Sequence, residues 1–411
     1  MSIFALQILL VGGATQGLCL ALLLATRHAN PLANRLLALL MLLVSAQSVL
    51  VAFDTREFFL AFPHLSRIGW LLPSLFGPLL YLFTRKLTSP APRLRRADAW
   101  HLLPFALVLA YLLPYYLQPA AAKIAYLRDF QAASRDDFGW LNQLLNLEHI
   151  GYLLAALHAL RRHGQRIRDE FSDLTRLRLR WLRQFLLFTL GIVLVGVAAF
   201  YGRKWGLSWI SNVYHFHYLG VIGLIYWIGY RALAQPELFS SAQQDIPPGA
   251  AAGGPNVGAA ALVVALEPTP AALPAPPDTT AAPAAKYQKS TLTPEQAQEV
   301  ADALLAFMRA HKPYRQNSLT IQELARQLEL PKHRLSQVLN EQLGKNFYDF
   351  VNEYRVEEVK HLLRDPRYAH YSTLGIAEEA GFNSKATFNA VFKKITGVTP
   401  SEYAKQSEIG V

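Results

Sequence analysis

The chain has 411 residues, of which 52% are hydrophobic and only 17% are charged. This composition is too apolar for an ordinary soluble protein and indicates that part of the chain lies in a membrane. The single cysteine, Cys19, excludes an intramolecular disulfide and a cysteine-rich metal site. The net charge is +11, but residues 286–411 hold 17 Lys and Arg against 15 Asp and Glu, so bulk charge gives no argument for nucleic-acid binding there.

Seven apolar segments are long enough to cross a bilayer, which takes about 20 helical residues. The third carries Pro73 and Pro78, so we expect it to be kinked. The amino terminus MSIFALQILL lacks the basic start of a cleavable signal peptide and is interpreted as part of the first span. The predicted spans are residues 3–25, 36–53, 68–84, 99–117, 139–160, 184–202 and 213–233.

The short loops between these spans differ in basic charge. Loops one, three and five hold 15 Lys and Arg, whereas loops two, four and six hold 7. Because basic loops stay on the cytoplasmic side, the odd loops are predicted to be cytoplasmic. The prediction is a multi-pass protein of the cell inner membrane with its amino terminus outside and its carboxyl terminus in the cytoplasm.

Between residues 247 and 285 the chain is rich in Ala, Pro and Gly and nearly uncharged. Such a segment buries too little apolar surface to offset its ordering entropy. We therefore predict a membrane domain at 1–235, a flexible linker at 236–290 and a further domain at 291–411.

The last domain has the start signals of amphipathic helices. Thr293, Thr320 and Thr399 each precede a Glu or Gln by three residues, which is the pattern of a capping box. No strand-like alternation competes with it. The predicted fold class is therefore all-α throughout, with a seven-helix transmembrane bundle, a linker and an all-α carboxyl-terminal domain.

The stretch GFNSKATFNAVFKKITGVTP, residues 381–400, has the spacing of a helix-turn-helix. Gly381 supplies a positive φ for the turn, Ser384 caps the second helix, and Gly397 ends it. Ala377 is small enough for the two helices to cross closely. The apolar stripe of the second helix is predicted to be Phe388, Val391, Phe392 and Ile395.

A similar unit lies upstream, in residues 319–344, where Leu324 and Leu328 face Leu335 and Leu339. Between the units, residues 346–363 have the pattern of a connecting helix. A helix of this kind can hold two recognition helices about 34 Å apart, which is one turn of B-DNA.

The carboxyl-terminal 100 or so residues resemble the AraC/XylS transcription regulators. The resemblance is carried by Gly381-Phe382, Ser384, Phe388, Phe392-Lys393-Lys394, Gly397, Thr399-Pro400 and Tyr403, with Tyr354-Arg355 in the connecting helix. The chain is similar to the subset, common in Bacteroidetes-type bacteria, in which a multi-span membrane module replaces the soluble sugar-binding domain. The resemblance implies sequence-specific binding near promoters and usually dimeric action on repeated half-sites.

Two positions depart from the family pattern. Glu329 stands where the first turn often has glycine, and Ala390 stands where many relatives carry arginine. We therefore expect the first unit to supply more of the sequence discrimination. The candidate contacts to double-stranded DNA are His333, Arg334, Ser336, Gln337, Asn340, Ser384, Lys385, Thr387, Asn389 and Lys393.

Glu148 and His149 fall near the middle of the fifth span, where ionisable side chains are costly and usually face a polar cavity or partner. They are candidates for a ligand or coupling site, and the alternative is a structural hydrogen bond. Gly13 and Gly17 form a GxxxG spacing that favours close helix packing. No catalytic motif, metal-ligand pattern or cofactor fingerprint is recognisable, so neither enzyme activity, nor a metal, nor a cofactor is expected.

These features together predict a membrane-embedded one-component regulator that responds to an unknown small-molecule or membrane signal and acts as a possible homodimer. Two alternatives remain. The membrane half can be a transporter or membrane enzyme with a fused regulatory module, or an anchor from which proteolysis releases the DNA-binding domain.

Overall fold

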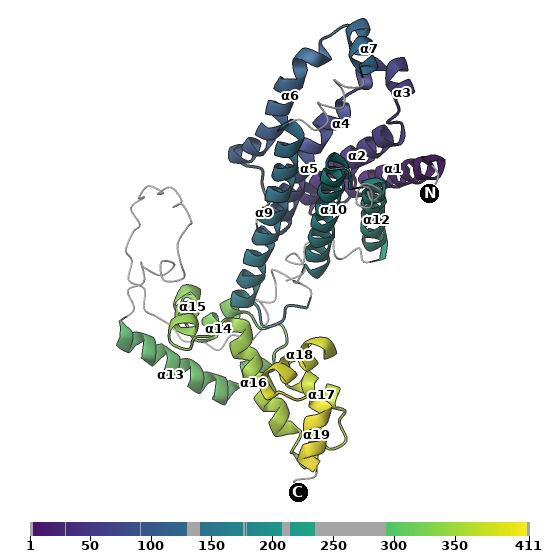
Figure 1. Ribbon diagram of the computed structural model, residues 1–411. Coiled ribbons are helices and arrows are strands. Elements are labelled where there is room, and N and C mark those ends of the chain that lie inside the picture. The colour runs from purple at the N-terminus through teal and green to yellow at the C-terminus, as the bar shows by residue number, and fades with distance from the viewer. Residues whose placement is uncertain are drawn as a thin grey trace, which may run out of the picture. The chain divides into compact units, whose positions relative to one another are not determined.

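The computed structural model describes residues 3–28, 30–90, 92–129, 140–175, 177, 179–207, 214–234 and 293–408. The predicted linker at 236–290 lies outside the described residues. The chain divides into two compact units: unit 1 is Met1–Gln165 with Arg176–Gln243, and unit 2 is Arg166–Thr175 with Gln244–Val411. Figure 1 shows that the described elements are helices, as the predicted all-α class requires. The one β-bridge in the described part joins Phe171 to Thr320.

In unit 1 every predicted span coincides with helix. Among the described residues, five helical stretches are long and apolar enough to cross a membrane: Phe4–Ala25, Pro31–Ala52, Pro63–Leu87, Arg96–Tyr116 and Arg180–Gly202. The helices of this unit are α1 (Ile3–Ala25), α2 (Pro31–Ala52), α3 (Arg56–Ala61), η1 (Pro63–Leu65), α4 (Ile68–Leu71), η2 (Leu72–Leu75), α5 (Phe76–Leu87), η3 (Arg96–Leu102), α6 (Leu103–Tyr116), α7 (Ala120–Arg128), α9 (Trp140–Glu170), α10 (Arg180–Lys204) and α12 (Tyr214–Ala234).

The two remaining predicted spans also form helices. Helix α9 is 31 residues long but carries polar and basic side chains along much of its length. Helix α12 is 21 residues long, and its stretch Leu219–Ile228 is apolar. The third span, which we expected to be kinked, is not one continuous α-helix: the chain passes from α4 through the 3₁₀ helix η2, which contains Pro73, into α5.

Helices from all along unit 1 contribute to its core. Leu24 of α1, Leu37 of α2, Phe83 of α5, Ala156 of α9 and Ile228 of α12 are each at most 1% exposed and belong to one hydrophobic cluster. These helices therefore pack as one bundle around a shared hydrophobic cluster, as the sequence predicted for this half of the chain.

The GxxxG glycines pack inside this bundle. A Cβ on Gly13 would lie 3.0 Å from Ile222 of α12, and one on Gly17 would lie 2.2 Å from Ser45 Oγ of α2. The missing side chains thus let α1 approach two neighbours closely.

Unit 2 is built around α16 (Phe347–Leu362), and Figure 1 shows α13 to α15 and α17 to α19 gathered toward its two ends. The other helices of this unit are α13 (Pro294–His311), η6 (Pro313–Arg315), α14 (Ile321–Gln327), α15 (Lys332–Glu341), η7 (Pro366–Tyr368), α17 (Thr373–Glu379), α18 (Lys385–Thr396) and α19 (Pro400–Glu408). The pairs α14–α15 and α17–α18 are the two predicted helix-turn-helix units.

The predicted helix starts are confirmed. Thr293 and Thr399 each form a reciprocal capping box, with Gln296 and Glu402 respectively. The hydroxyls of Thr320 and Ser384 accept hydrogen bonds from the backbone amides of Glu323 and Thr387. Local sequence therefore fixes where these helices begin.

Each helix-turn-helix unit has its own apolar core. In the first, Leu324, Leu335 and Phe350 are at most 2% exposed and share one cluster. In the second, the Phe388 ring lies 5.2 Å from the Phe382 ring and 5.6 Å from the Phe392 ring, centroid to centroid. Ile395 was expected in this stripe but is 37% exposed, because the packed part of α18 ends one turn earlier.

Candidate nucleic-acid interface

Helix α15 presents the candidate contacts of the first unit. His333 and Asn340 are exposed, whereas Arg334, Ser336 and Gln337 are half-buried. Within the part of the chain that the structure describes, no hydrogen bond or ion pair engages the Arg334 guanidinium. Arg334 therefore keeps its five N–H donors available for an outside partner.

The two amide side chains on α15 are held along their own helix. Gln337 Nε2 donates to Glu341 at 2.7 Å, and Asn340 Nδ2 donates to the carbonyl of Ser336 at 2.8 Å. These bonds span four residues, the spacing of neighbours on a helix surface. A base contact by either amide would replace a weak intrahelical bond rather than add to it.

Helix α18 offers fewer long polar side chains. Lys385 and Asn389 are exposed, and the exposed Ala390 adds no donor between them and the helix end. The Ser384 hydroxyl donates to Thr387 Oγ1 at 3.1 Å, so both hydroxyls of the cap are engaged with each other. The prediction that the first unit discriminates more between sequences rests on this shortage of long side chains.

The two lysines at the end of α18 have different surroundings. Lys393 is exposed, whereas Lys394 pairs with Asp349 of α16 at 2.9 Å. Burial raises the pKa of the Asp349 carboxyl, but the hydrogen bonds from Lys394 and Asn346 outweigh it and hold that pKa below its usual value. Lys394 therefore fastens α18 to the connecting helix.

Arg355, in the middle of α16, is 1% exposed. Its Nε donates to the carbonyl of Tyr314 at 2.8 Å, and its Nη2 donates to the carbonyl of Gln316 at 2.8 Å and to Ser172 Oγ at 3.1 Å. Burial lowers the pKa of Arg355 to about 10, while the charge of Asp173 raises it, so the guanidinium is charged at neutral pH. A buried guanidinium needs such acceptors, and Arg355 is therefore a structural hub rather than a DNA contact.

Residues 166–175 pack as part of unit 2, a contribution that the sequence did not predict. Glu170 pairs with Lys332 at 3.1 Å, Asn383 Nδ2 donates to Asp173 at 3.0 Å, and the hydroxyls of Thr175 and Thr387 lie 3.2 Å apart. The available signal was three carboxylates, Asp169, Glu170 and Asp173, in a loop that is otherwise arginine-rich.

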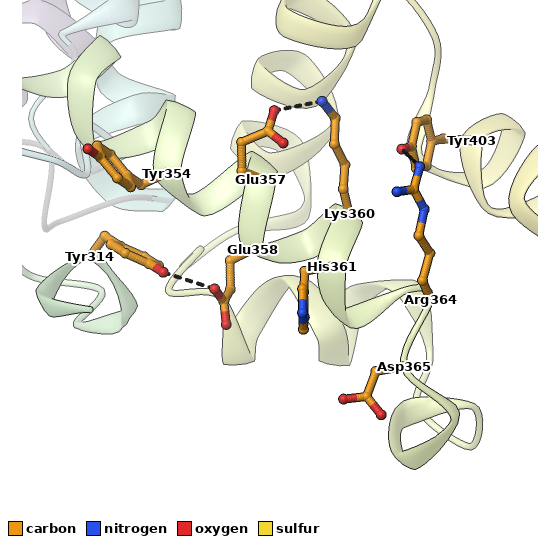
Figure 2. Close-up of a pocket in the computed structure, with 9 residues that line it drawn as sticks. All are labelled: Tyr314, Tyr354, Glu357, Glu358, Lys360, His361, Arg364, Asp365 and Tyr403. Carbon is orange, nitrogen blue, oxygen red and sulfur yellow. Dashed lines mark hydrogen bonds and ion pairs between the residues drawn. The ribbon is translucent and has the colours of Figure 1, made fainter. Parts of the chain in front are cut away.

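A hollow of about 850 Å³ in unit 2 lies elsewhere, against the carboxyl-terminal half of α16. Its lining, drawn in Figure 2, comprises Tyr314, Tyr354, Glu357, Glu358, Lys360, His361, Arg364, Asp365 and Tyr403. No candidate DNA contact is among them. The charged groups pair with one another or with neighbours, as Glu357 does with Lys360 at 2.7 Å, so the hollow is better explained as part of the scaffold than as a ligand site.

Glu358 of α16 holds this helix against η6. Its carboxylate accepts from Lys312 at 3.0 Å, from Tyr314 at 2.9 Å and from Arg315. Burial raises the pKa of Glu358, but the three donors together outweigh burial and hold it below its usual value.

The candidate membrane residues lie inside unit 1. Glu148 Oε2 is 3.2 Å from His149 Nδ1, but that ring nitrogen bonds the Leu145 carbonyl at 2.6 Å, and neither Glu148 oxygen has a hydrogen-bond partner among the described residues. Glu148 and His149 are therefore close to each other but are not joined by a hydrogen bond. A Cβ on Gly77 of α5 would lie 3.1 Å from Glu148 Oε1, so the carboxylate faces α5.

Two helix pairs joined by one helix define a tandem helix-turn-helix domain. Residues 324–406 match the family model described as "Helix-turn-helix domain". This match covers both recognition helices and confirms the class of the carboxyl-terminal domain.

The curated relatives match over the same region. An uncharacterized response regulatory protein of Staphylococcus epidermidis is 32% identical over 97 residues, which is 24% of this chain and 37% of the relative. The transcriptional regulatory protein HptR of Staphylococcus aureus is 29% identical over 93 residues, 23% of this chain and 35% of the relative. The chain thus spans little more than a third of the length of these relatives.

One solved structure, a protein of unknown function from Listeria innocua, is 25% identical and matches with a TM-score of 0.23. The match covers 26% of this chain and 95% of that one.

Proposed function

We propose that this protein is a membrane-embedded one-component transcription regulator that binds promoter DNA sequence-specifically. The observation that carries the proposal is the tandem of helix-turn-helix units on α16, in a region that matches a helix-turn-helix family and regulatory relatives. Its role is regulation rather than catalysis, and it requires no cofactor.

The readout of double-stranded DNA is assigned mainly to α15. Arg334 would read guanine through O6 and N7, and Gln337 or Asn340 would read adenine through N6 and N7. His333 and Ser336 flank these readers. On α18, Ser384, Lys385, Thr387, Asn389 and Lys393 would contact the second half-site, with Lys393 directed to phosphate.

The membrane placement rests on the five long apolar helices and on the charge of the loops. With basic loops inside, the amino terminus is outside and the helix-turn-helix domain reaches the chromosome from the cytoplasmic face. The partners are thus the lipid bilayer, double-stranded DNA, a second copy of the chain and an unknown small-molecule or membrane signal.

Signal reception is assigned to the bundle, where Glu148 and His149 lie next to α5. A flexible linker transmits no rigid rotation, but pairing of two bundles would hold two DNA-binding domains at an effective concentration near the millimolar range. Signal-dependent dimerisation would then favour occupancy of adjacent half-sites.

DNA binding is tested with the full-length protein in lipid nanodiscs and a random-sequence duplex library. The expected result is enrichment of duplexes that share a repeated half-site, and mapping of genome occupancy would place those sites at promoters. Recovery of duplexes without any shared sequence would contradict the proposal.

The orientation is tested with reporter fusions. Fusions after Arg96 and Arg180 are expected to score cytoplasmic, and a fusion after Asp129 is expected to score external. An external score after Arg180 would reverse the proposed topology.

A further inference from the structure

Residues 166–175 follow α9 and precede α10 in the chain, yet they pack as an integral part of unit 2. Phe171 forms a β-bridge with Thr320, and the amide and hydroxyl of Ser172 donate to the carbonyl of Leu319 at 3.2 and 2.7 Å. Ser172 and Leu174 are 1% and 2% exposed. The segment is therefore seated in the helix-turn-helix domain rather than resting on it.

The seated segment reaches the beginnings of three helices. The bridge to Thr320 is at the N-cap of α14, and Glu170 pairs with Lys332, the first residue of α15. Asp173 accepts from Asn383 in the turn before α18, and Thr175 contacts Thr387 in the first turn of α18. Six consecutive residues thus connect the starts of both recognition helices.

Helix starts are the parts of a helix-turn-helix that meet DNA. The first residues of the recognition helix contact base edges, and the amide-rich end of a helix attracts phosphate. Here carboxylates occupy those positions: Glu170 accepts a hydrogen bond from the Lys332 ammonium, and Asp173 accepts one from the Asn383 amide. Both donors are of the kind that bind phosphate oxygens.

Building on the function proposed above, we propose that the starts of α14, α15 and α18 form one docking surface with two mutually exclusive occupants. One occupant is duplex DNA, and the other is residues 170–175 of the same chain. Release of the segment frees the Lys332 ammonium, the Asn383 amide and the Thr387 hydroxyl from their contacts with Glu170, Asp173 and Thr175.

The reach of the segment supports exclusion. Six residues extend at most roughly 20 Å, so the seated segment occupies part of the interval between the two recognition helices. A duplex that receives both helices in successive major grooves must cross that interval. The segment and the duplex would therefore compete for the same volume as well as for the same donors.

The chain connectivity makes this surface a point of control. Glu170 is the last residue of α9, and α10 begins at Arg180, so both ends of the segment are joined to helices of the proposed sensor. A signal that binds two arrangements of these helices with different affinity would shift the segment between seated and released states. This route needs no information to pass through the linker.

The decisive test locks the segment in place without changing charge. In full-length protein with Cys19→Ser, the pair Thr175→Cys and Thr387→Cys would join two positions whose hydroxyls now lie 3.2 Å apart. The oxidised and reduced forms of this one protein, in nanodiscs, are compared for affinity to the duplex that the reduced form enriches from a random library.

Oxidation is expected to weaken binding at least about tenfold, and reduction to restore it. Equal affinity of the two forms, or failure of the disulfide to form under oxidant, would overturn the inference and leave the proposed function intact. If the reduced form and the unmodified protein both enrich no duplex, the proposed function itself fails.

A second test releases the segment. Glu170→Ala with Asp173→Ala is expected to tighten binding about fivefold, because the seated state loses two contacts. The matched control is Glu357→Ala with Asp365→Ala, which also removes two carboxylates and breaks two ion pairs of 2.7 Å away from the segment, with Lys360 and with Arg367. An equal gain in the control would show that the effect is only a change in net charge.

Discussion

The first helix-turn-helix unit turns through Glu329, with φ of 55°, and the second turns through Gly381, with φ of 95°. Glu329 is exposed, so its side chain extends into solvent and the turn carries only backbone strain of about 1 kcal/mol. A Cβ on Gly381, in contrast, would lie 2.4 Å from the carbonyl oxygen of Tyr314 and 2.8 Å from that of Arg315. The first turn is thus a local feature, whereas the second packs against η6, which lies outside its own helix pair.

The recognition helices differ in the same sense. Helix α15 leaves the guanidinium of Arg334 available and has no side-chain cap, whereas α18 is capped by Ser384 and tied to α16 through Lys394. The second unit is thus anchored to the domain, and we propose that the first unit reads the DNA sequence. Four predictions test this difference.

The largest effect is expected for Gly381→Ala. Positive φ and the clash with the Tyr314 carbonyl should together lower the free energy of unfolding of the second unit by about 3 kcal/mol. Hydrogen exchange of the α17 and α18 amides in the full-length protein measures this loss.

The matched control is Gly397→Ala, where φ is 82° but nothing lies within 4 Å of the new Cβ. The control should cost about 1 kcal/mol. Equal losses for the two variants would mean that the contact with Tyr314 contributes nothing.

The next effect concerns readout. Arg334→Ala should lower specific DNA affinity by about 2 kcal/mol and relax one base position, because a bidentate guanine contact is lost. Asn389→Ala on α18 should lower it less, and Lys393→Ala should weaken specific and random DNA alike. Binding-site profiles of the three variants measure these effects. An unchanged profile for Arg334→Ala would show that α15 does not read bases in the major groove.

A third prediction concerns acid. The pKa of Glu358 in the folded protein lies below the ordinary value of 4.5, so between these two values the unfolded chain binds more protons. The stabilisation from Glu358 is therefore complete above about pH 4.5 and is lost as pH falls through the folded pKa. Unfolding measured at pH 6 and pH 3.5 should show a smaller difference for Glu358→Gln than for the unmodified protein; an equal difference would assign the acid sensitivity to other carboxylates.

The smallest effect is expected for Glu329→Gly. Relief of the left-handed strain should raise the free energy of unfolding of the first unit, although greater freedom of the unfolded chain offsets part of it and leaves about 0.5 kcal/mol. Hydrogen exchange of the α14 and α15 amides measures the gain. A loss of stability would show that the Glu329 side chain makes a contribution beyond its backbone conformation.

Much of unit 2 could be predicted from the sequence because its signals are local. Thr320 and Ser384 cap helices through amides three residues away, and Gly397 ends α18 with a positive φ. The candidate contacts followed from the same helical spacing, which places them on α15 and α18. In unit 1, composition indicated the apolar helices, but α9 is too polar over its 31 residues to meet the criterion for a span.

The sequence by itself determined where the capped helices of unit 2 begin and the two helix-turn-helix units, because capping, apolar spacing and glycine conformation act over three or four residues. Only the tertiary structure decided that Gly381 meets the carbonyl of Tyr314 and that Ser172 completes the hydrogen bonds of Arg355. These partners lie 67 and 183 residues apart in the chain, and no local pattern encodes such a distance. The packing of residues 166–175 against the recognition helices is also decided only by the tertiary structure. It depends on burial and on hydrogen bonds that form only in the folded domain.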